Sequence, residues 1–174
     1  MDFKPPKKNE NLLDRLTALA SGKENLLDVL EREHQEVKEL LEKILKAEKA
    51  PERKALFKKF QPAFLAHAHA EEVMFYPLLK QAKEKQSRTD AIEGYIEHHL
   101  AEGLVKALAK SGPITGEDWT ARCHVVKDLI EHHIKEEQNT IFKDARKNLG
   151  EAKLEALVPL FDLAKKKFLA RAKI

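Results

Sequence analysis

Histidines fall at helix-compatible spacings twice in this chain, in two stretches that lie 64 or 65 residues apart. Each stretch has one lone histidine and, further on, a second histidine with a glutamate four residues after it. Side chains four residues apart share one face of a helix, so each histidine–glutamate pair points in one direction. The complete set is His34, His67, Glu71, His98, His132 and Glu136. We therefore expect the fold to bring four imidazoles and two carboxylates into one place.

The apolar pattern around these residues predicts long amphipathic helices. Charged residues make up 35% of the chain and aromatic residues 6%, a mixture that favours helix over sheet. His34 interrupts a stripe of leucine, valine and isoleucine with steps of three and four residues, which indicates one core-facing seam. A second seam is predicted at Phe57, Phe60, Phe64, His67, Glu71, Met74 and Leu78.

The pattern predicts an all-α, antiparallel up-down-up-down four-helix bundle with additional short N-terminal and C-terminal helices. A capping box at Ser21–Glu24 opens the first long helix, Pro51 starts the second, and Thr115 with Asp118 caps the fourth. The expected helices are 9–20, 24–48, 51–84, 89–110, one from the cap at Thr115 to about 147, and 151–172. We divide the chain into an N-terminal extension with a short helix (1–23), a metal-binding bundle (24–147) and a C-terminal amphipathic helix packed on the bundle (148–174).

Composition narrows the class of function. The formal charge of +3 gives no support for nucleic-acid binding. Cys123 is the single cysteine, which excludes an intrachain disulfide and favours a reducing compartment. The start of the chain does not resemble a signal peptide, and no run approaches the roughly 20 apolar residues of a membrane span. We therefore expect a cytoplasmic, soluble protein that does not act at a membrane.

The donor set suits a pair of metal ions. Four imidazoles supply four bonds, two bridging carboxylates supply four more, and a bridging oxo or hydroxo group adds two. Two five-coordinate ions then keep room for a small ligand. Mixed imidazole and carboxylate donors suit iron, and also manganese or zinc. Burying the six side chains without a metal would cost several kcal/mol in unpaired polar groups.

Four segments resemble the hemerythrin family, in its bacterial histidine–histidine–glutamate branch: EREHQEVKELL, HAHAEEVMFYP, EHHLAEGLVKAL and EHHIKEEQNTIF. The family signature of His, HxxxE, His and HxxxE maps onto the six residues named above and covers roughly residues 24–147. The resemblance implies four antiparallel helices around a non-heme di-iron site. It also implies functions that range over oxygen binding, iron or redox sensing and peroxide handling.

Several positions can be interpreted in two ways. The His98–His99 and His132–His133 doublets are ambiguous by one residue, and the repeat favours His98 and His132 over His99 and His133. Glu137 is then a solvent or supporting group, like His99 and His133. Oxygen-carrying members of the family resemble one another in a second histidine on the third helix, where this chain has Glu102, a candidate seventh ligand. They also place the last carboxylate five residues after its histidine rather than four.

Tyr95 is either a hydrogen-bond donor to a bound oxygen ligand or a core aromatic. Our leading hypothesis is a non-heme di-iron protein that binds dioxygen or a related small molecule for sensing, storage or protection against oxidative stress. The departures at Glu102 and Glu136 favour a second hypothesis, a di-iron enzyme that breaks down peroxide or nitric oxide, so enzymatic activity stays undecided. A third hypothesis is a metal-free or zinc-bound helical interaction module. We expect a monomer or a weak homodimer.

Overall fold

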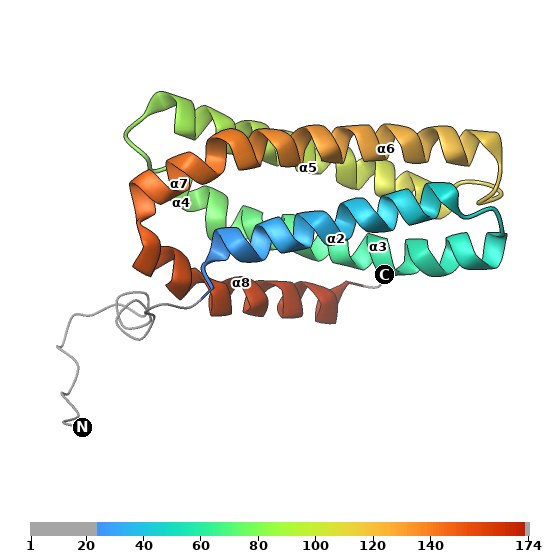
Figure 1. The fold of residues 1–174 in the computed structure, drawn as a ribbon, viewed down its shortest axis with the longest axis horizontal. Coiled ribbons are helices and arrows are strands. Elements are labelled where there is room, and N and C mark those ends of the chain that lie inside the picture. Colours follow the sequence, from blue (N-terminus) through green and yellow to red (C-terminus); the bar gives the residue numbers. More distant parts are fainter. Residues whose placement is uncertain (1–23, 173–174) are drawn as a thin grey trace, which may run out of the picture.

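Residues 24–172 form a bundle of four long helical rods with an additional helix along one side (Figure 1). The computed structural model describes residues 24–172, so the expected helix at 9–20 and the extension at 1–23 lie outside the described residues. The rods run antiparallel to their neighbours, as predicted for an up-down-up-down bundle. None of the described helices is long and apolar enough to cross a membrane.

The first two rods are joined by a tight loop. Helix α2 (Leu26–Lys46) begins after Asn25, whose side chain accepts hydrogen bonds from the backbone of Leu27 and Asp28. Asp28 accepts a bond from the Asn25 backbone in return, so the capping box that opens α2 starts at Asn25 and not at the predicted position. Helix α3 (Ala50–Ala70) has Pro51 in its first turn, as predicted. It continues to a π-helical turn η1 (Glu71–Phe75) and the short helix α4 (Tyr76–Leu79).

The second pair of rods repeats this plan. Helix α5 (Lys85–Lys110) is followed by α6 (Glu117–Glu136), a second π-helical turn η2 (Glu137–Ile141) and α7 (Phe142–Leu149). The predicted cap at Thr115 is wrong, because Gly116 caps α6 without a side-chain hydrogen bond. Gly150 ends α7, with a positive φ of 75° that favours glycine.

The π turn η1 explains an error in the predicted second seam. A π turn adds one residue to a helical turn and shifts the following side chains around the axis. Phe75, Tyr76 and Leu79 are therefore fully buried, whereas Met74 and Leu78 are only partly covered. The π turns begin at Glu71 and Glu137, so each marks the height at which a carboxylate enters the bundle.

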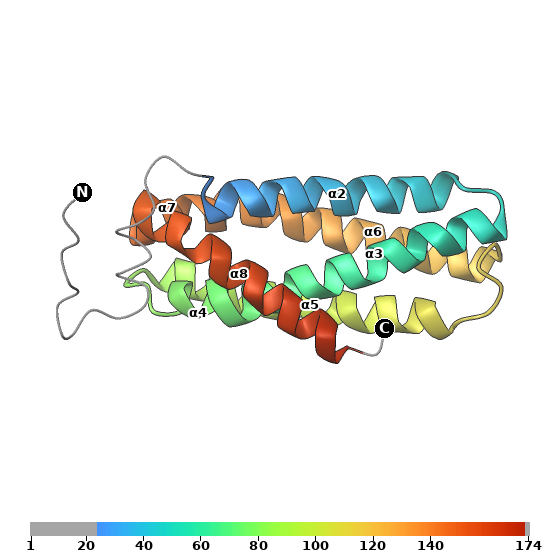
Figure 2. The same ribbon diagram turned by 90° about the horizontal axis from the view of Figure 1, so that it is seen from below.

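Helix α8 (Glu151–Arg171) covers one side of the bundle only. It crosses α3 obliquely, as the view from below shows (Figure 2). It also contacts α2. Leu154, Leu157 and Phe161 from α8 join an apolar cluster at the end of the bundle where α2 begins. A second apolar cluster fills the opposite end around Leu41, Phe60 and the neighbouring rings. The polar residues of the site form a layer between the two clusters.

Candidate metal centre

Six buried side chains converge between the two apolar clusters. Each of the four long rods supplies one histidine, and each π turn supplies one glutamate as its first residue. All six are at most 5% exposed. The set is His34 from α2, His67 from α3, Glu71 from η1, His98 from α5, His133 from α6 and Glu137 from η2.

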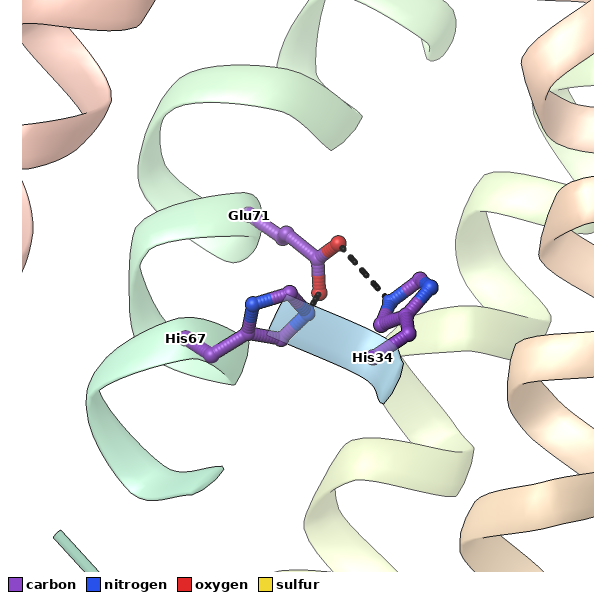
Figure 3. Close-up of side chains that lie close together, drawn as sticks. All are labelled: His34, His67 and Glu71. Atoms are coloured by element: carbon purple, nitrogen blue, oxygen red, sulfur yellow. Dashed lines mark ion pairs between the residues drawn. The ribbon is translucent and has the colours of Figure 1, made fainter. Parts of the chain in front are cut away.

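The first half of the site contains His34, His67 and Glu71 (Figure 3). The Glu71 carboxylate lies between the two imidazoles, with Oε2 3.3 Å from His67 Nε2 and Oε1 3.9 Å from His34 Nε2. One donor atom from each residue lies within 4.8 Å of the others, which is the proximity that a shared metal ion needs.

The second half contains His98 and His133, and Glu71 belongs to it as well. The Nε2 atoms of His98 and His133 lie 3.0 Å apart. At this distance one nitrogen either donates a proton to the other, or both direct their lone pairs at a cation held between them. His98 Nε2 also lies 3.3 Å from Glu71 Oε2.

Both buried carboxylates span the two halves. Glu71 contacts His34 and His67 on one side and His98 on the other. Glu137 Oε2 lies 3.2 Å from His34 Nε2 and 3.9 Å from His133 Nε2. A carboxylate has two oxygens, so each glutamate is placed to bridge a pair of cations.

In three of the four histidines the outer nitrogen, Nδ1, faces a supporting carboxylate. His67 Nδ1 lies 2.9 Å from Glu33 Oε2, and His133 Nδ1 lies 2.7 Å from Glu97 Oε2. His98 Nδ1 lies 3.3 Å from Glu72 Oε1. A carboxylate that receives the Nδ1 proton fixes the tautomer and leaves Nε2 free to bind metal. Sequence reasoning did not assign this role, although Glu33 and Glu97 directly precede the two lone histidines.

Charges around the site shift several pKa values. Burial alone would lower the pKa of His67, but the Glu71 charge and the hydrogen bond with Glu33 raise it to about 10. Burial also opposes the charged form of His98, and Glu71 and Glu72 raise its pKa to about 9. For Glu71, burial favours the neutral acid, but His67 and His98 hold its pKa well below the ordinary value.

The prediction that His132 and Glu136 point into the bundle is wrong. Their side chains are 58% and 51% exposed, and the next residues, His133 and Glu137, take the inner positions. The repeat between the inner HxxxE pairs is 66 residues rather than 65, because the loop before α6 is longer than the loop before α3. The apolar stripe of α6 carries the missed signal. Its buried members, Trp119, Cys123, Val126 and Ile130, lead to His133 in steps of three and four.

Glu102 and Tyr95 both point away from the buried histidines. Glu102 lies on the outer face of α5 and pairs with Lys106, so it does not approach the site. Tyr95 donates its hydroxyl proton to the backbone carbonyl of Glu72 at 2.6 Å. The tyrosine that reaches the site is Tyr76, which sequence reasoning missed. Its hydroxyl lies 3.4 Å from Nε2 of His98 and 3.5 Å from Nε2 of the histidine on α6, His133.

The donor atoms fit a bound metal. Within residues 24–172, several fully buried polar atoms have no hydrogen-bond partner, and they face the centre of the site. They include His34 Nε2, His67 Nε2 and both carboxylate oxygens of Glu71 and of Glu137. Unpaired buried polar groups cost about 1–3 kcal/mol each, and coordination to a cation would satisfy all of them. Imidazole nitrogen with carboxylate oxygen is a donor set that suits iron, manganese and zinc.

A cleft leads from the surface to the second half of the site. It has a volume of about 580 Å³ and runs between α5 and the rod formed by α6, η2 and α7. His133 and Glu137 form part of its lining, together with Gly94. The first half lies on the side of the bundle that α8 contacts, and its His34 lines a separate surface pocket formed mostly by residues of α2.

Four antiparallel helices around buried imidazoles and carboxylates define a helical cation-binding domain. A model of the hemerythrin HHE cation binding domain matches residues 25–145, which is more than half of the chain. The chain therefore belongs to the hemerythrin HHE cation-binding domain family.

Two individual proteins support the comparison. The crystal structure of a hemerythrin HHE cation binding domain-containing protein from Mycobacterium kansasii superposes with a TM-score of 0.71 and 22% identity. The match covers 86% of this chain and 92% of that chain, and at this identity it shows the fold. A curated relative from Nostoc sp., described as a DNA nickase, is 24% identical over 147 residues. That match covers 84% of this chain but only 41% of the relative.

Proposed function

We propose that the protein is a non-heme di-iron protein that binds dioxygen or a related small molecule. The observation that carries the proposal is the position of the two buried glutamates. Glu71 and Glu137 each approach histidines of both halves, and their four oxygens have no hydrogen-bond partner within the described residues. One ion per half, with both carboxylates shared, would satisfy the whole set.

The residues that would hold the two ions divide evenly. His34 and His67 would bind the first ion, His98 and His133 would bind the second, and Glu71 and Glu137 would bind both. When bound, such a pair of ions supplies electron exchange with small oxidants. Manganese or zinc suits the same donors, and zinc would supply no electron exchange.

The residues around the second half of the site suit a small-molecule ligand. The cleft reaches His133 and Glu137, so a molecule of a few atoms enters on that side. Tyr76 places its hydroxyl beside His98 and His133. Burial, followed by the charges of Glu137 and Glu71, raises the pKa of Tyr76 well above its ordinary value. Tyr76 therefore keeps its proton and offers a hydrogen-bond donor to a ligand in the second half.

The Tyr76 hydroxyl also favours the second candidate function, breakdown of peroxide or nitric oxide at the same centre. A buried donor beside the ligand position is able to deliver a proton to a departing oxygen atom. Oxygen evolution from hydrogen peroxide by the iron-loaded protein, and its decrease in Tyr76→Phe, would favour this candidate over reversible binding. The nicking activity named for the Nostoc relative is not carried over, since this chain matches less than half of that protein.

The test of the proposed centre is metal content measured with matched variants. We expect the wild-type protein, loaded with ferrous iron and then desalted, to retain two irons per chain and to absorb in the near ultraviolet. Glu71→Gln and Glu137→Gln should lose most of this iron, because each removes a shared ligand. Glu102→Gln is the control, since that carboxylate faces outward and pairs with Lys106. Equal iron retention in all four proteins would refute the proposal.

A further inference from the structure

The two residues that do not enter the bundle, His132 and Glu136, form a second group with Glu97 on its surface. His132 Nε2 lies 3.3 Å from Glu136 Oε1 and 3.7 Å from Glu97 Oε1. One donor atom from each of the three residues lies within 4.8 Å of the others. One imidazole and two carboxylates at this spacing form a set of donors for a divalent transition-metal ion.

Glu97 links the surface group to the buried centre. Its Oε2 faces His133 Nδ1 at 2.7 Å, while its Oε1 faces His132. One oxygen of this carboxylate therefore supports a buried ligand, and the other is directed at the surface group.

The first half of the molecule has a carboxylate equivalent to Glu97, and the neighbours of the two carboxylates differ. Glu33 occupies the position of Glu97, with Oε2 facing His67, and its Oε1 pairs with the ammonium group of Lys165 from α8. Glu97 has no lysine or arginine partner among residues 24–172. The positions that correspond to His132 and Glu136 are Ala66 and Ala70, which are buried. In the first half, the lysine ammonium group therefore neutralises the outer oxygen of the supporting carboxylate. In the second half, that oxygen faces an imidazole, and a further carboxylate lies beside the imidazole.

The surface group also borders the cleft to the buried centre. Glu97 and Glu136 line the cleft together with Glu137, whose carboxylate is fully buried and has no hydrogen-bond partner in the described structure. The remaining wall has four more carboxylates, from Glu84, Asp90, Glu93 and Asp144, and Lys143 is the one lysine or arginine that lines it among residues 24–172. A cleft lined by charges of one sign concentrates counter-ions and accelerates their arrival.

We propose that Glu97, His132 and Glu136 form a peripheral site for a divalent transition-metal ion, and that this site delivers ions through the cleft to the buried centre. The delivery step rests on the proposed function, whereas the existence of the peripheral site does not. The peripheral ion has three protein ligands and faces solvent, so it exchanges more readily than an ion held by the buried residues.

Zinc binding at equilibrium tests the site. We expect wild-type protein, dialysed against excess Zn²⁺, to hold one more ion per chain than His132→Ala or Glu136→Gln. His124→Ala is the matched control. His124 is an exposed histidine on the same helix with Asp128 four residues later, but it belongs to no three-donor group in the described residues. If His132→Ala and His124→Ala bind as many ions as the wild type, the peripheral site does not exist.

A further variant distinguishes ions bound at the buried centre from the ion bound at the peripheral site. His34→Ala removes a buried ligand that is not part of the surface group, so it should lower the count of retained ions yet keep the rapidly exchanging one. An unchanged count in His34→Ala would contradict the proposed buried centre, and loss of the exchangeable ion in that variant would contradict a separate peripheral site.

Delivery is tested by the rate at which ferrous iron enters the metal-free protein. We expect His132→Ala to take up iron several-fold more slowly than His124→Ala, with the same final iron content after desalting. Equal uptake rates in the two variants would overturn the delivery role, whatever the zinc measurement shows.

Discussion

The two halves of the bundle contain the same inner ligands but differ in what surrounds them. Each half has a glutamate–histidine pair on its first rod and an HxxxE pair that leads into a π turn on its second rod. Around this shared pattern, α8 contacts the first half, whereas the cleft opens onto the second. Residues next to the ligands also differ: Phe142 stacks near His34 in the first half, and its counterpart Tyr76 places a hydroxyl in the second.

A glycine permits this difference. An added Cβ at Gly94 would lie 2.8 Å from Tyr76 Cζ and 2.9 Å from its hydroxyl oxygen. The corresponding residue of the first rod is Leu30, which is fully buried. The comparison teaches that two halves of an internal repeat can keep the same ligand residues while the residues around those ligands take different roles. In the first half a phenyl ring lies beside the ligands and α8 packs along one side, whereas the second half opens onto the cleft and carries a proton donor.

The largest effect should separate His133 from its neighbour His132. His133→Ala removes an inner ligand, and we expect the desalted, iron-loaded protein to lose most of its iron. His132→Ala should retain it after complete loading, because that side chain faces outward. Iron analysis measures the metal content, and far-ultraviolet circular dichroism confirms that each variant is folded. Loss of iron in His132→Ala alone would reverse the assignment of the second half.

The pH dependence of metal binding should show one proton from each half. In the metal-free protein, His67 with a pKa of about 10 and His98 with a pKa of about 9 are both protonated at neutral pH. Metal binding requires the neutral imidazole, so it must release both protons. We expect release of about two protons per chain at pH 7, and an affinity that rises about 100-fold per pH unit between pH 7 and about pH 8, with a smaller slope as the pH approaches the pKa of His98. Titration in weakly buffered solution checks the release; a release below one proton would contradict these pKa values.

The supporting carboxylates should matter almost equally in the two halves. Glu33→Ala and Glu97→Ala each remove the acceptor for an Nδ1 proton, and a loss of this kind lowers metal affinity roughly 10–100-fold. Glutamine at either position keeps an oxygen acceptor and should restore part of the affinity. Competition with a chelator gives the affinities. A loss confined to one position would show that the two halves support their ligands differently.

Substitution of Gly94 tests the space for the Tyr76 hydroxyl. Gly94→Ala forces the ring to move within a packed core, and overpacking of this kind costs about 1–3 kcal/mol. Gly103→Ala on the same helix is the control, since an added Cβ there meets nothing within 4 Å and alanine favours helix by up to about 1 kcal/mol. Urea unfolding measures both. Equal stability of the two variants would mean that Tyr76 is free to shift.

The smallest effect is expected for the ion pair between Lys165 and Glu33 in the first half. Lys165→Met removes the cation beside Glu33 but keeps most of the apolar length of the side chain. Because both partners are partly exposed, we expect a loss of at most about 1 kcal/mol in unfolding free energy, relative to Lys166→Met on the exposed face. A larger loss would show that α8 depends on this ion pair for its position.

Much of the site followed from local spacing. Apolar seams identified His34 and His67 as inward-facing, the repeat added His98, and the i, i+4 rule added Glu71. Family resemblance and helical patterning agreed on the bundle. The same rules failed at the second HxxxE pair because a doublet of histidines followed by a doublet of glutamates offers two pairs, and the repeat is not constant. Local spacing did not predict the supporting roles of Glu33 and Glu97, because each carboxylate contacts a histidine that is distant in the sequence.

The amino-acid sequence by itself determined the helical rods, their order and the residue types that the core had to accept, because these depend on spacing along one chain. Only the tertiary structure decided which member of each doublet faces inward, which tyrosine reaches the ligands and which half is covered by α8. Those outcomes depend on loop length, on the extra residue of a π turn and on the packing of distant helices. A shift of one residue rotates a side chain by about 100° around a helix, which is enough to move an imidazole from the buried centre to the surface.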